Sequence, residues 1–214
     1  MSKQRRIRYQ CRSAARRSLL AVLLACMASF GMPAGASEDA NEQANSRLTA
    51  AKQTTLGLYV TALEAYEMWK AAPDTVKIVD VRTPEEFIFV GNPEMAWKVP
   101  MAGQSDQWDA DKREFPMTLL PDFVERVRRI AGPDDTLLVM CRSGGRSALA
   151  VNLLAEDGFR KVYSITDGME GDSVKDPDSV FVGQRLVNGW KNSGLPWTYD
   201  VDPERMVLPA KRAD

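Results

Sequence analysis

The hydrophobic pattern of the chain consists of short, mainly apolar runs separated by longer segments in which apolar residues recur at helical spacing. The runs at 76–81, 136–140 and 161–165 have the length of strands and lack a polar face, which is typical of strands covered on both sides. Segments with helical character lie around these runs, at 58–72 after a short strand, 121–133 and 145–158. This alternation predicts an α/β fold in which a central parallel sheet is flanked by helices on both faces.

Local signals add detail to this outline. In TPEEF, Thr83 is a good helix N-cap, Pro84 suits the first turn, and Glu86 completes a capping box, so a helix is predicted to start there. The segment 95–101 has the composition of another strand, which Pro100 weakens. Residues 102–118 show no clean period and are expected to form a long loop or insertion.

Residues 1–36 have the three regions of a secretory signal. The first 17 residues carry seven basic side chains and no acidic one, and a mainly apolar run of twelve residues, too short to cross a bilayer comfortably, follows at 19–30. Ala34 and Ala36 are spaced as in an A-x-A cleavage site. We therefore expect a periplasmic or secreted protein.

Two refinements of the export signal stay open. The stretch ARRSLLA resembles a twin-arginine signal, whereas LLAC, which ends at Cys26, resembles a lipoprotein cleavage box. Cleavage at Cys26 would leave a lipid-anchored protein, and a membrane partner is expected only in that case.

The remaining chain reads as one domain with a leader and a tail. We expect a polar N-terminal leader at 37–56, with ordered structure beginning near Leu58, a domain at 57–200 and a C-terminal tail at 201–214. Within the domain, insertions are expected near 102–118 and 170–187. The acidic residues of the second insertion do not have the spacing of an EF-hand, so no metal site is predicted there.

Composition excludes several classes of function. The chain contains no histidine, which removes Ser-His-Asp and Cys-His catalysis and any histidine metal site. Without residues 1–36, 21 basic residues remain against 29 acidic ones, for a net charge near −8. A chain so acidic, without a basic stripe, is not expected to bind nucleic acid.

The cysteines point to one candidate nucleophile. Cys11 and Cys26 fall within the predicted signal, so cleavage after Ala36 leaves Cys141 alone. A single cysteine cannot form an intramolecular disulfide or a cysteine zinc cluster. Cys141 is therefore either an incidental buried thiol or a reactive one.

The sequence around Cys141 favours the reactive alternative. CRSGGR (141–146) follows a predicted central strand and precedes a helix, which is where open α/β sheets bind ligands. Gly144 and Gly145 allow the backbone to curl its N–H groups inward, and the helix N-terminus adds positive potential. These groups, with Arg142 and Arg146, favour a thiolate at Cys141. The sequence does not decide which arginine faces the thiol.

Three motifs together identify a family resemblance. IVDVRTPEEF, CRSGGRS and DGM…GWKNSGLPW resemble the rhodanese sulfurtransferases, over about Leu58 to Trp197. The resemblance implies that Cys141 takes a sulfane sulfur from thiosulfate or a related anion, becomes a persulfide and passes the sulfur to cyanide or a thiol. It implies that backbone N–H groups hold the outer sulfur and the departing sulfite, and that no cofactor or metal takes part. The substrate-binding residues would be Arg142, Ser143, Gly144, Gly145 and Arg146, with Asp80 and Arg82 in support.

This chain departs from the family pattern at two places. Asn92 stands where many members have a histidine, and we expect little effect because that histidine is not the nucleophile. The 170–187 insertion replaces what is often a short connection, and we hypothesise that it walls the pocket and selects the donor or acceptor.

Other functions remain as alternatives. Cysteine phosphatases of similar architecture use C-x5-R, whereas Cys141 to Arg146 is C-x4-R, which disfavours phosphatase activity. A partner-dependent periplasmic persulfide carrier would use the same cysteine with little turnover on free substrates, its acceptor being a thiol or redox protein. A thiol redox sensor is disfavoured because no second cysteine would resolve an oxidised one.

Overall fold

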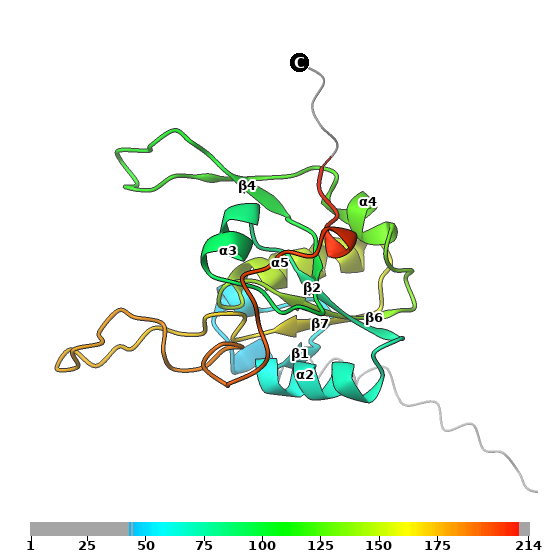
Figure 1. Cartoon of the computed structure of the whole chain (residues 1–214), viewed down its shortest axis with the longest axis horizontal. Helices are drawn as coiled ribbons and strands as arrows, with labels where there is room; N and C mark the ends of the chain where they lie inside the picture. Colours follow the sequence, from blue (N-terminus) through cyan, green and yellow to red (C-terminus); the bar gives the residue numbers. More distant parts are fainter. Residues whose placement is uncertain (1–42, 44, 210–214) are drawn as a thin grey trace, which may run out of the picture. The chain divides into compact units, whose positions relative to one another are not determined.

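The computed structural model describes residue 43 and residues 45–209 (Figure 1). The predicted secretory signal at 1–36, including Cys26, lies outside the described residues. Within the described range, no helix has the length and apolar character needed to cross a membrane.

The core of the molecule is a five-stranded parallel sheet in the order β1-β7-β6-β2-β3. In the central pair, β2 and β6 run in register from Val76 opposite Thr136 to Asp80 opposite Met140. The carboxyl ends of these two strands therefore lie side by side, and Cys141 follows directly after one of them. The strands span β1 Tyr59–Val60, β2 Val76–Asp80, β3 Trp97–Lys98, β6 Thr136–Met140 and β7 Lys161–Ile165.

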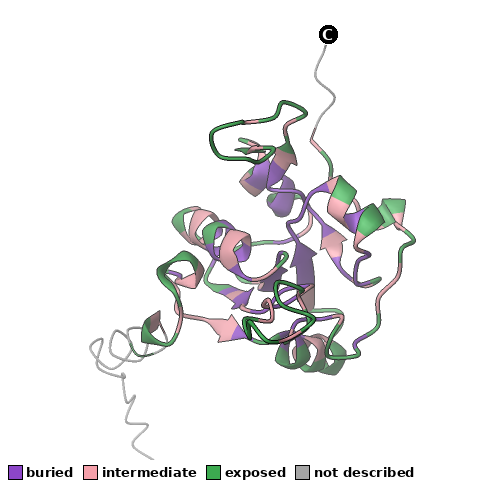
Figure 2. Ribbon diagram, turned by 90° about the vertical axis from the view of Figure 1, so that its left-hand side faces the viewer, coloured by how far each residue is buried: buried purple, intermediate pink, exposed green. Residues whose placement is uncertain are grey.

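Helices cover both faces of the sheet, as the hydrophobic pattern predicted (Figures 1 and 2). On one face, side chains such as Val79 and Val139 pack against α4 (Phe123–Arg128) and α5 (Gly145–Glu156). On the other, Ile78, Leu138 and Trp190 pack with α2 (Ala62–Ala71). Full burial of each such aliphatic side chain stabilises the fold by about 1.5–3 kcal/mol relative to exposure.

The predicted helix start at Thr83 is confirmed. Helix α3 (Pro84–Phe89) begins with a capping box, in which the Glu86 N–H donates to Thr83 Oγ1 (3.4 Å) and the Thr83 N–H donates to Glu86 Oε2 (2.9 Å). These bonds satisfy N–H groups that have no partner inside the helix. Glu86 is thereby fixed at the edge of the sheet where β2 ends.

Residues 102–118, expected to be a long loop or insertion, include two short strands. Strands β4 (Ala102–Gln104) and β5 (Met117–Leu119) form an antiparallel ribbon, and Asp109 pairs with Glu114 further out. We call residues 102–119 the first arm. All three β5 residues are exposed and Ala102 is the one buried residue of β4, so the ribbon has too few buried positions to impose an alternating pattern on its sequence.

The insertion predicted near 170–187 is also an ordered projection. Near its base, the Val174 N–H donates to the Gln184 carbonyl (2.8 Å), and the Gly183 N–H donates to the Val174 carbonyl (2.9 Å). We call residues 172–187 the second arm. Both arms stand out as exposed loops in Figure 2.

Ordered structure begins before Leu58, contrary to expectation. A short 3-10 helix, η1 (Ala50–Lys52), packs against α5, and the Thr55 N–H donates to Asn152 Oδ1 (2.8 Å). Lys52 forms an ion pair with Asp172 of the second arm (3.1 Å). These are polar contacts, which leave no apolar periodicity in the sequence.

Candidate functional site

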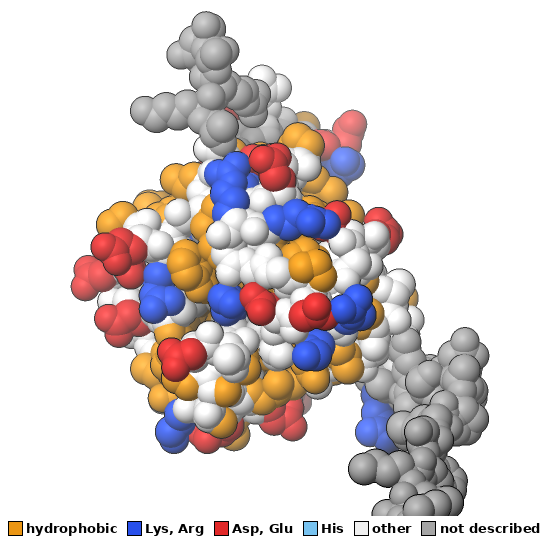
Figure 3. Space-filling view, turned by 90° about the vertical axis from the view of Figure 1, so that its right-hand side faces the viewer, with side chains coloured by type: hydrophobic (Ala, Val, Ile, Leu, Met, Phe, Trp, Pro, Cys, Tyr) orange, Lys and Arg blue, Asp and Glu red, His pale blue; other side chains and the backbone are white. Residues whose placement is uncertain are grey.

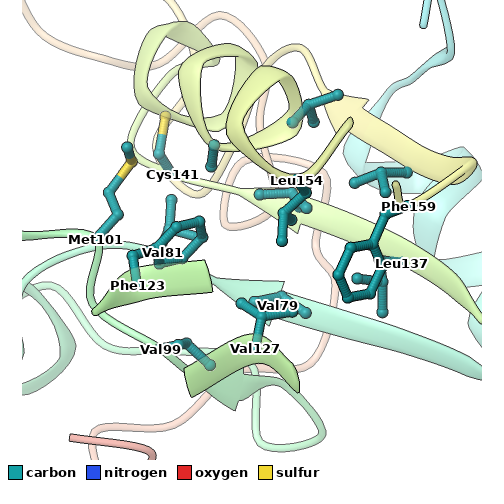
Figure 4. Close-up of a cluster of buried hydrophobic side chains, with 14 of the residues drawn as sticks. Val79, Val81, Val99, Met101, Phe123, Val127, Leu137, Cys141, Leu154 and Phe159 are labelled. Atoms are coloured by element: carbon teal, nitrogen blue, oxygen red, sulfur yellow. The ribbon is translucent and has the colours of Figure 1, made fainter. Parts of the chain in front are cut away.

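Cys141 lies at the carboxyl edge of the sheet, immediately after β6. Its side chain is 2% exposed and belongs to the apolar cluster that contains Met101 and Val81 (Figure 4). Its Sγ atom accepts a hydrogen bond from the Gly144 N–H (3.2 Å) and lies 3.8 Å from the Ser147 hydroxyl. The thiol is therefore buried but faces polar groups on one side.

The glycine at position 144 makes this geometry possible. Gly144 is the N-cap of α5 and has φ of +103°, a left-handed conformation that residues with a Cβ rarely adopt. A Cβ there would lie 2.3 Å from the Thr166 carbonyl oxygen. The loop can direct the Gly144 N–H at Cys141 because this position carries no side chain.

Ser147 holds the cysteine loop in place through hydrogen bonds, a role that sequence reasoning missed. Its hydroxyl donates to the Gly144 carbonyl (2.9 Å) and lies 3.2 Å from the Ser164 hydroxyl of β7. Both serines are buried. The only signal in the sequence was the serine that ends the CRSGGRS motif.

The two arginines of the loop have different partners. Arg146 forms a two-pronged ion pair with Glu86, at 2.7 and 2.6 Å, and its Nη1 lies 3.7 Å from the Met117 sulfur. Burial lowers the pKa of Arg146, but hydrogen bonds and the charge of Glu86, and then the charge of Cys141, outweigh burial and raise it. Of the two loop arginines, Arg146 is the one whose pKa includes a contribution from the charge of Cys141.

Arg142 points outward instead. Its guanidinium is half-exposed and pairs with Glu170 (3.0 Å), while Ser143 is partly exposed and Gly145 opens α5. The structure brings all six residues of the predicted loop together. Sequence reasoning had not identified Glu86 and Glu170 as the partners of the two arginines, because both pairs join segments far apart in the chain.

The turn after β7 clamps the loop through its backbone. The Met169 N–H donates to the Cys141 carbonyl (2.8 Å), and the Glu170 N–H donates to the Arg142 carbonyl (2.9 Å). Asp167 anchors this turn by accepting from the Ala62 N–H (2.7 Å) and the Gly189 N–H. The DGM motif therefore acts as a brace for the cysteine loop.

Asp80 and Arg82 brace a neighbouring segment. Both side chains are 0% exposed, with Arg82 Nε 2.9 Å from Asp80 Oδ1 and Arg82 Nη2 2.6 Å from Asp80 Oδ2. Arg82 Nη2 also donates to the Gly91 carbonyl (2.8 Å). The pair therefore ties the end of β2 to the turn after α3.

Asn92, at the position of the family histidine, has a structural place here. It is buried, and its backbone exchanges hydrogen bonds with Thr198 at 2.8 and 2.9 Å. Its side-chain amide also donates to the Asp200 carbonyl (3.2 Å). These bonds fasten the C-terminal segment to the domain.

The described residues contain no group of three or more acidic, cysteine or histidine side chains arranged to hold a metal ion. The site that they do form is a buried thiol that accepts a hydrogen bond from the Gly144 N–H, with the partly buried Arg146–Glu86 ion pair beside the loop.

Comparison with known proteins agrees with the fold. The family model described as "Rhodanese-like domain" matches residues 61–173. The chain belongs to this family. The match includes the cysteine loop and the first arm and ends at the start of the second arm, so most of the second arm lies beyond the matched part.

Relatives of this rhodanese-like chain come from bacteria and plants. Thiosulfate sulfurtransferase 16, chloroplastic, of Arabidopsis thaliana is 37% identical over 120 residues, which make up 56% of this chain and 78% of the relative. An uncharacterized RP600 homolog of Rickettsia rickettsii is 29% identical over 140 residues, or 65% of this chain and 96% of the relative. The crystal structure of Rv0390 from M. tuberculosis superposes with a TM-score of 0.51 at 28% identity, covering 66% of this chain and 96% of that one.

A glycine-to-alanine comparison tests the brace in this rhodanese-like domain. Gly168 has φ of +60°, and a Cβ there would lie 2.5 Å from the Cys141 carbonyl oxygen. Gly168→Ala is therefore expected to lower the thermal unfolding midpoint and to change the rate at which iodoacetamide alkylates Cys141. Gly194→Ala is a matched control, because Gly194 has φ of +69° but nothing within 4 Å of its Cβ position. The control should lose only the stability that a left-handed backbone costs a residue with a Cβ, about 1–2 kcal/mol. If both variants change the alkylation rate equally, the turn after β7 does not clamp the cysteine loop.

The Arg146–Glu86 pair predicts a pH dependence of stability. Burial raises the pKa of Glu86, but hydrogen bonds and the charge of Arg146 outweigh burial and hold it below its usual value of 4.5. A lowered folded-state pKa means that this stabilisation is present above about pH 4.5 and is lost as the pH falls further. In urea unfolding, the difference between wild type and Glu86→Gln should shrink as the pH drops from 6 to about 3.5. The exposed neighbour offers a control, Glu85→Gln, and a Glu86→Gln difference that stays constant with pH would refute the assignment.

Proposed function

We propose that this protein is a sulfurtransferase that takes a sulfane sulfur from thiosulfate or a related anion onto Cys141 and passes it to cyanide or a thiol acceptor. One observation carries the proposal most: Cys141 Sγ sits at the end of β6 in a curled loop, with the Gly144 N–H directed at it. Membership of the rhodanese-like family and the similarity to a plant thiosulfate sulfurtransferase support it.

The first step would load the sulfur. The Cys141 thiolate attacks the outer sulfur of thiosulfate, a new S–S bond forms, and the bond to sulfite breaks with its electron pair leaving on sulfite. Both reactants are anions, so positive potential is needed to bring them together. Arg146, the Gly144 N–H and the N-terminus of α5 supply that potential.

The second step would transfer the outer persulfide sulfur to the acceptor. Cyanide or a thiolate attacks the outer sulfur of the persulfide, the S–S bond breaks, and the Cys141 thiolate leaves with the electron pair. Electrons balance over the two steps without an external oxidant or reductant. The thiolate that leaves is held by the same groups that favoured it as a nucleophile.

The test is production of thiocyanate from thiosulfate and cyanide by the purified protein. The proposal expects turnover that saturates with thiosulfate and releases one sulfite for each thiocyanate. A folded protein with a titratable thiol but no thiocyanate would refute turnover on these free substrates.

The burial of Cys141 favours a second candidate, a persulfide carrier that depends on a partner protein. A sulfur that is 2% exposed is poorly placed to meet free substrates unless the groups above it move. Under this alternative, thiosulfate and cyanide react slowly, and a protein acceptor accelerates unloading. The ratio of turnover with protein and small acceptors separates the two candidates.

A further inference from the structure

Exposed apolar side chains gather on three segments of this protein. Of the 15 large apolar side chains that are exposed in the described part of the chain, 11 lie on α3, the first arm or the second arm. Soluble monomers rarely expose apolar surface in such concentration unless it binds something. The 11 are Ile88, Phe89, Trp108, Phe115, Met117, Leu119, Val180, Phe181, Val182, Leu186 and Val187.

Each of the three segments is linked to the cysteine loop or begins beside it. In Figure 1 both arms project to the left of the molecule, with α3 between them. Helix α3 follows the carboxyl end of β2, and the second arm follows the turn that clamps the loop. Arg142 is paired with Glu170 at the base of the second arm. The exposed apolar side chains therefore lie on segments that adjoin the cysteine loop.

Both arms are held in shape by their own contacts. In the first arm, Trp108 and Phe115 pack edge to face at 5.1 Å, and Asp109 and Glu114 exchange backbone hydrogen bonds of 2.9 and 3.2 Å. Hydrogen bonds near the base of the second arm hold its two branches together. Side chains fixed before binding lose little entropy on docking, which favours a role in recognition.

The first arm also contacts groups of the cysteine loop and of its apolar cluster. Met117 lies against Arg146, and Arg146 is tied to Glu86 of α3. At the base of the arm, the Leu120 N–H donates to the carbonyl of Met101, which packs in the cluster of Cys141 (2.9 Å). Displacement of this arm would therefore disturb contacts of the cysteine loop.

The charges on the arms identify the kind of partner. Both arms carry charges of both signs, with an excess of carboxylates: the first arm has Asp106, Asp109, Asp111 and Glu114 against Lys112 and Arg113, and the second arm has Asp172, Asp176 and Asp178 against Lys175 and Arg185. Anionic lipid would be repelled by these carboxylates, whereas lysine and arginine would be attracted. The opposite side of the molecule, shown in Figure 3, mixes acidic and basic side chains.

We propose that α3 and the two arms dock a sulfur-acceptor protein that presents a cysteine on an apolar surface bordered by lysine and arginine. The proposal rests on the persulfide function of Cys141. The acceptor thiolate attacks the outer persulfide sulfur, the S–S bond to Cys141 breaks, and the Cys141 thiolate leaves. The acceptor thus carries away the persulfide, and no other reactant is needed.

Two synthetic peptides test the proposal. Each has one cysteine and the same apolar residues, but one is flanked by lysines and the other by glutamates. The protein loaded with thiosulfate is expected to transfer sulfur to the lysine peptide about tenfold faster, in kcat/KM, than to the glutamate peptide. Equal rates for the two peptides would overturn the proposal.

Variants assign the preference to the arms. Trp108→Ser and Phe181→Ser should each lower transfer to the lysine peptide about fivefold or more, while transfer to free cysteine stays unchanged. Leu208→Ser is the matched control, because Leu208 is as exposed as Met117, at 45%, but lies outside the arms. Effects of the same size in the control would overturn the proposal.

Charge reversal on the second arm provides an independent test. The double variant Asp176→Lys with Asp178→Lys should shift the preference toward the glutamate peptide. Asp74→Lys, at an exposed site in the turn before β2 and hence at the opposite edge of the sheet, should leave the preference unchanged. If the double variant keeps the wild-type preference for the lysine peptide, the proposed role of the second arm in docking is contradicted.

Binding measurements separate failure of docking from failure of the persulfide chemistry. Calorimetry with Cys141→Ser protein and serine analogues of both peptides needs no sulfur transfer, so it tests docking even if thiosulfate never loads Cys141. Preferential, Phe181-dependent binding of the lysine peptide supports docking. Phe181-dependent binding to phosphatidylglycerol vesicles would instead assign the surface to a membrane and overturn the proposal.

Discussion

Cys141→Ser is expected to reduce thiocyanate formation to the uncatalysed background while leaving the protein folded. The serine hydroxyl cannot form a persulfide, so both steps of the proposed reaction are lost. The fold should survive because serine is close in size and can accept the hydrogen bond that the Gly144 N–H now donates to Sγ. Thiocyanate production and far-UV circular dichroism, measured on the same sample, check the two halves of this prediction.

Ser147→Ala supplies the comparison for that variant. Ser147 lies 3.8 Å from Cys141 Sγ and supports the loop, but it leaves the nucleophile in place. Loss of the Ser147 hydroxyl should lower the rate of thiocyanate formation without abolishing it. Retention of full activity in Cys141→Ser would show that the sulfur is carried elsewhere.

Asp80→Asn is expected to destabilise the protein by about 3–5 kcal/mol, the usual effect of neutralising one partner of a fully buried ion pair. Arg82 would keep its charge with no carboxylate beside it, in a place where neither side chain is exposed. Its Nη1 atom is already buried without a hydrogen-bond partner among the described residues. Urea unfolding at neutral pH measures the change.

An exposed pair provides the matched control. Asp134 and Arg160 form an ion pair in which the side chains are 75% and 69% exposed. Asp134→Asn should change the stability by less than about 1 kcal/mol, because water screens the pair. A loss of similar size at both positions would contradict the assignment of Asp80 as a buried support of the site.

Local sequence signals predicted the parts of the fold that depend on neighbouring residues. Thr83, Pro84 and Glu86 fix the start of α3 within four positions, and the glycine at 144 sits where the backbone takes a left-handed turn. The apolar runs predicted the strands since burial on both faces leaves no polar alternation. The same features placed Cys141 at the carboxyl edge of the sheet.

Contacts between distant segments could not be predicted in this way. Arg146 pairs with Glu86, 60 positions away, and this partner was visible only as a member of a capping box. The ribbon of the first arm has too few buried residues to show strand alternation. Lys52 and Thr55 hold the N-terminal segment through single polar contacts, which have no periodic signature.

The persulfide itself is the most direct test of the account. The protein is incubated with thiosulfate, freed of excess reagent, and its intact mass is measured before and after cyanide is added. The account predicts a gain equal to one sulfur atom, located at Cys141 by peptide mapping and removed by cyanide with release of thiocyanate. An unchanged mass on a folded protein, or a sulfur on any residue other than Cys141, would contradict it.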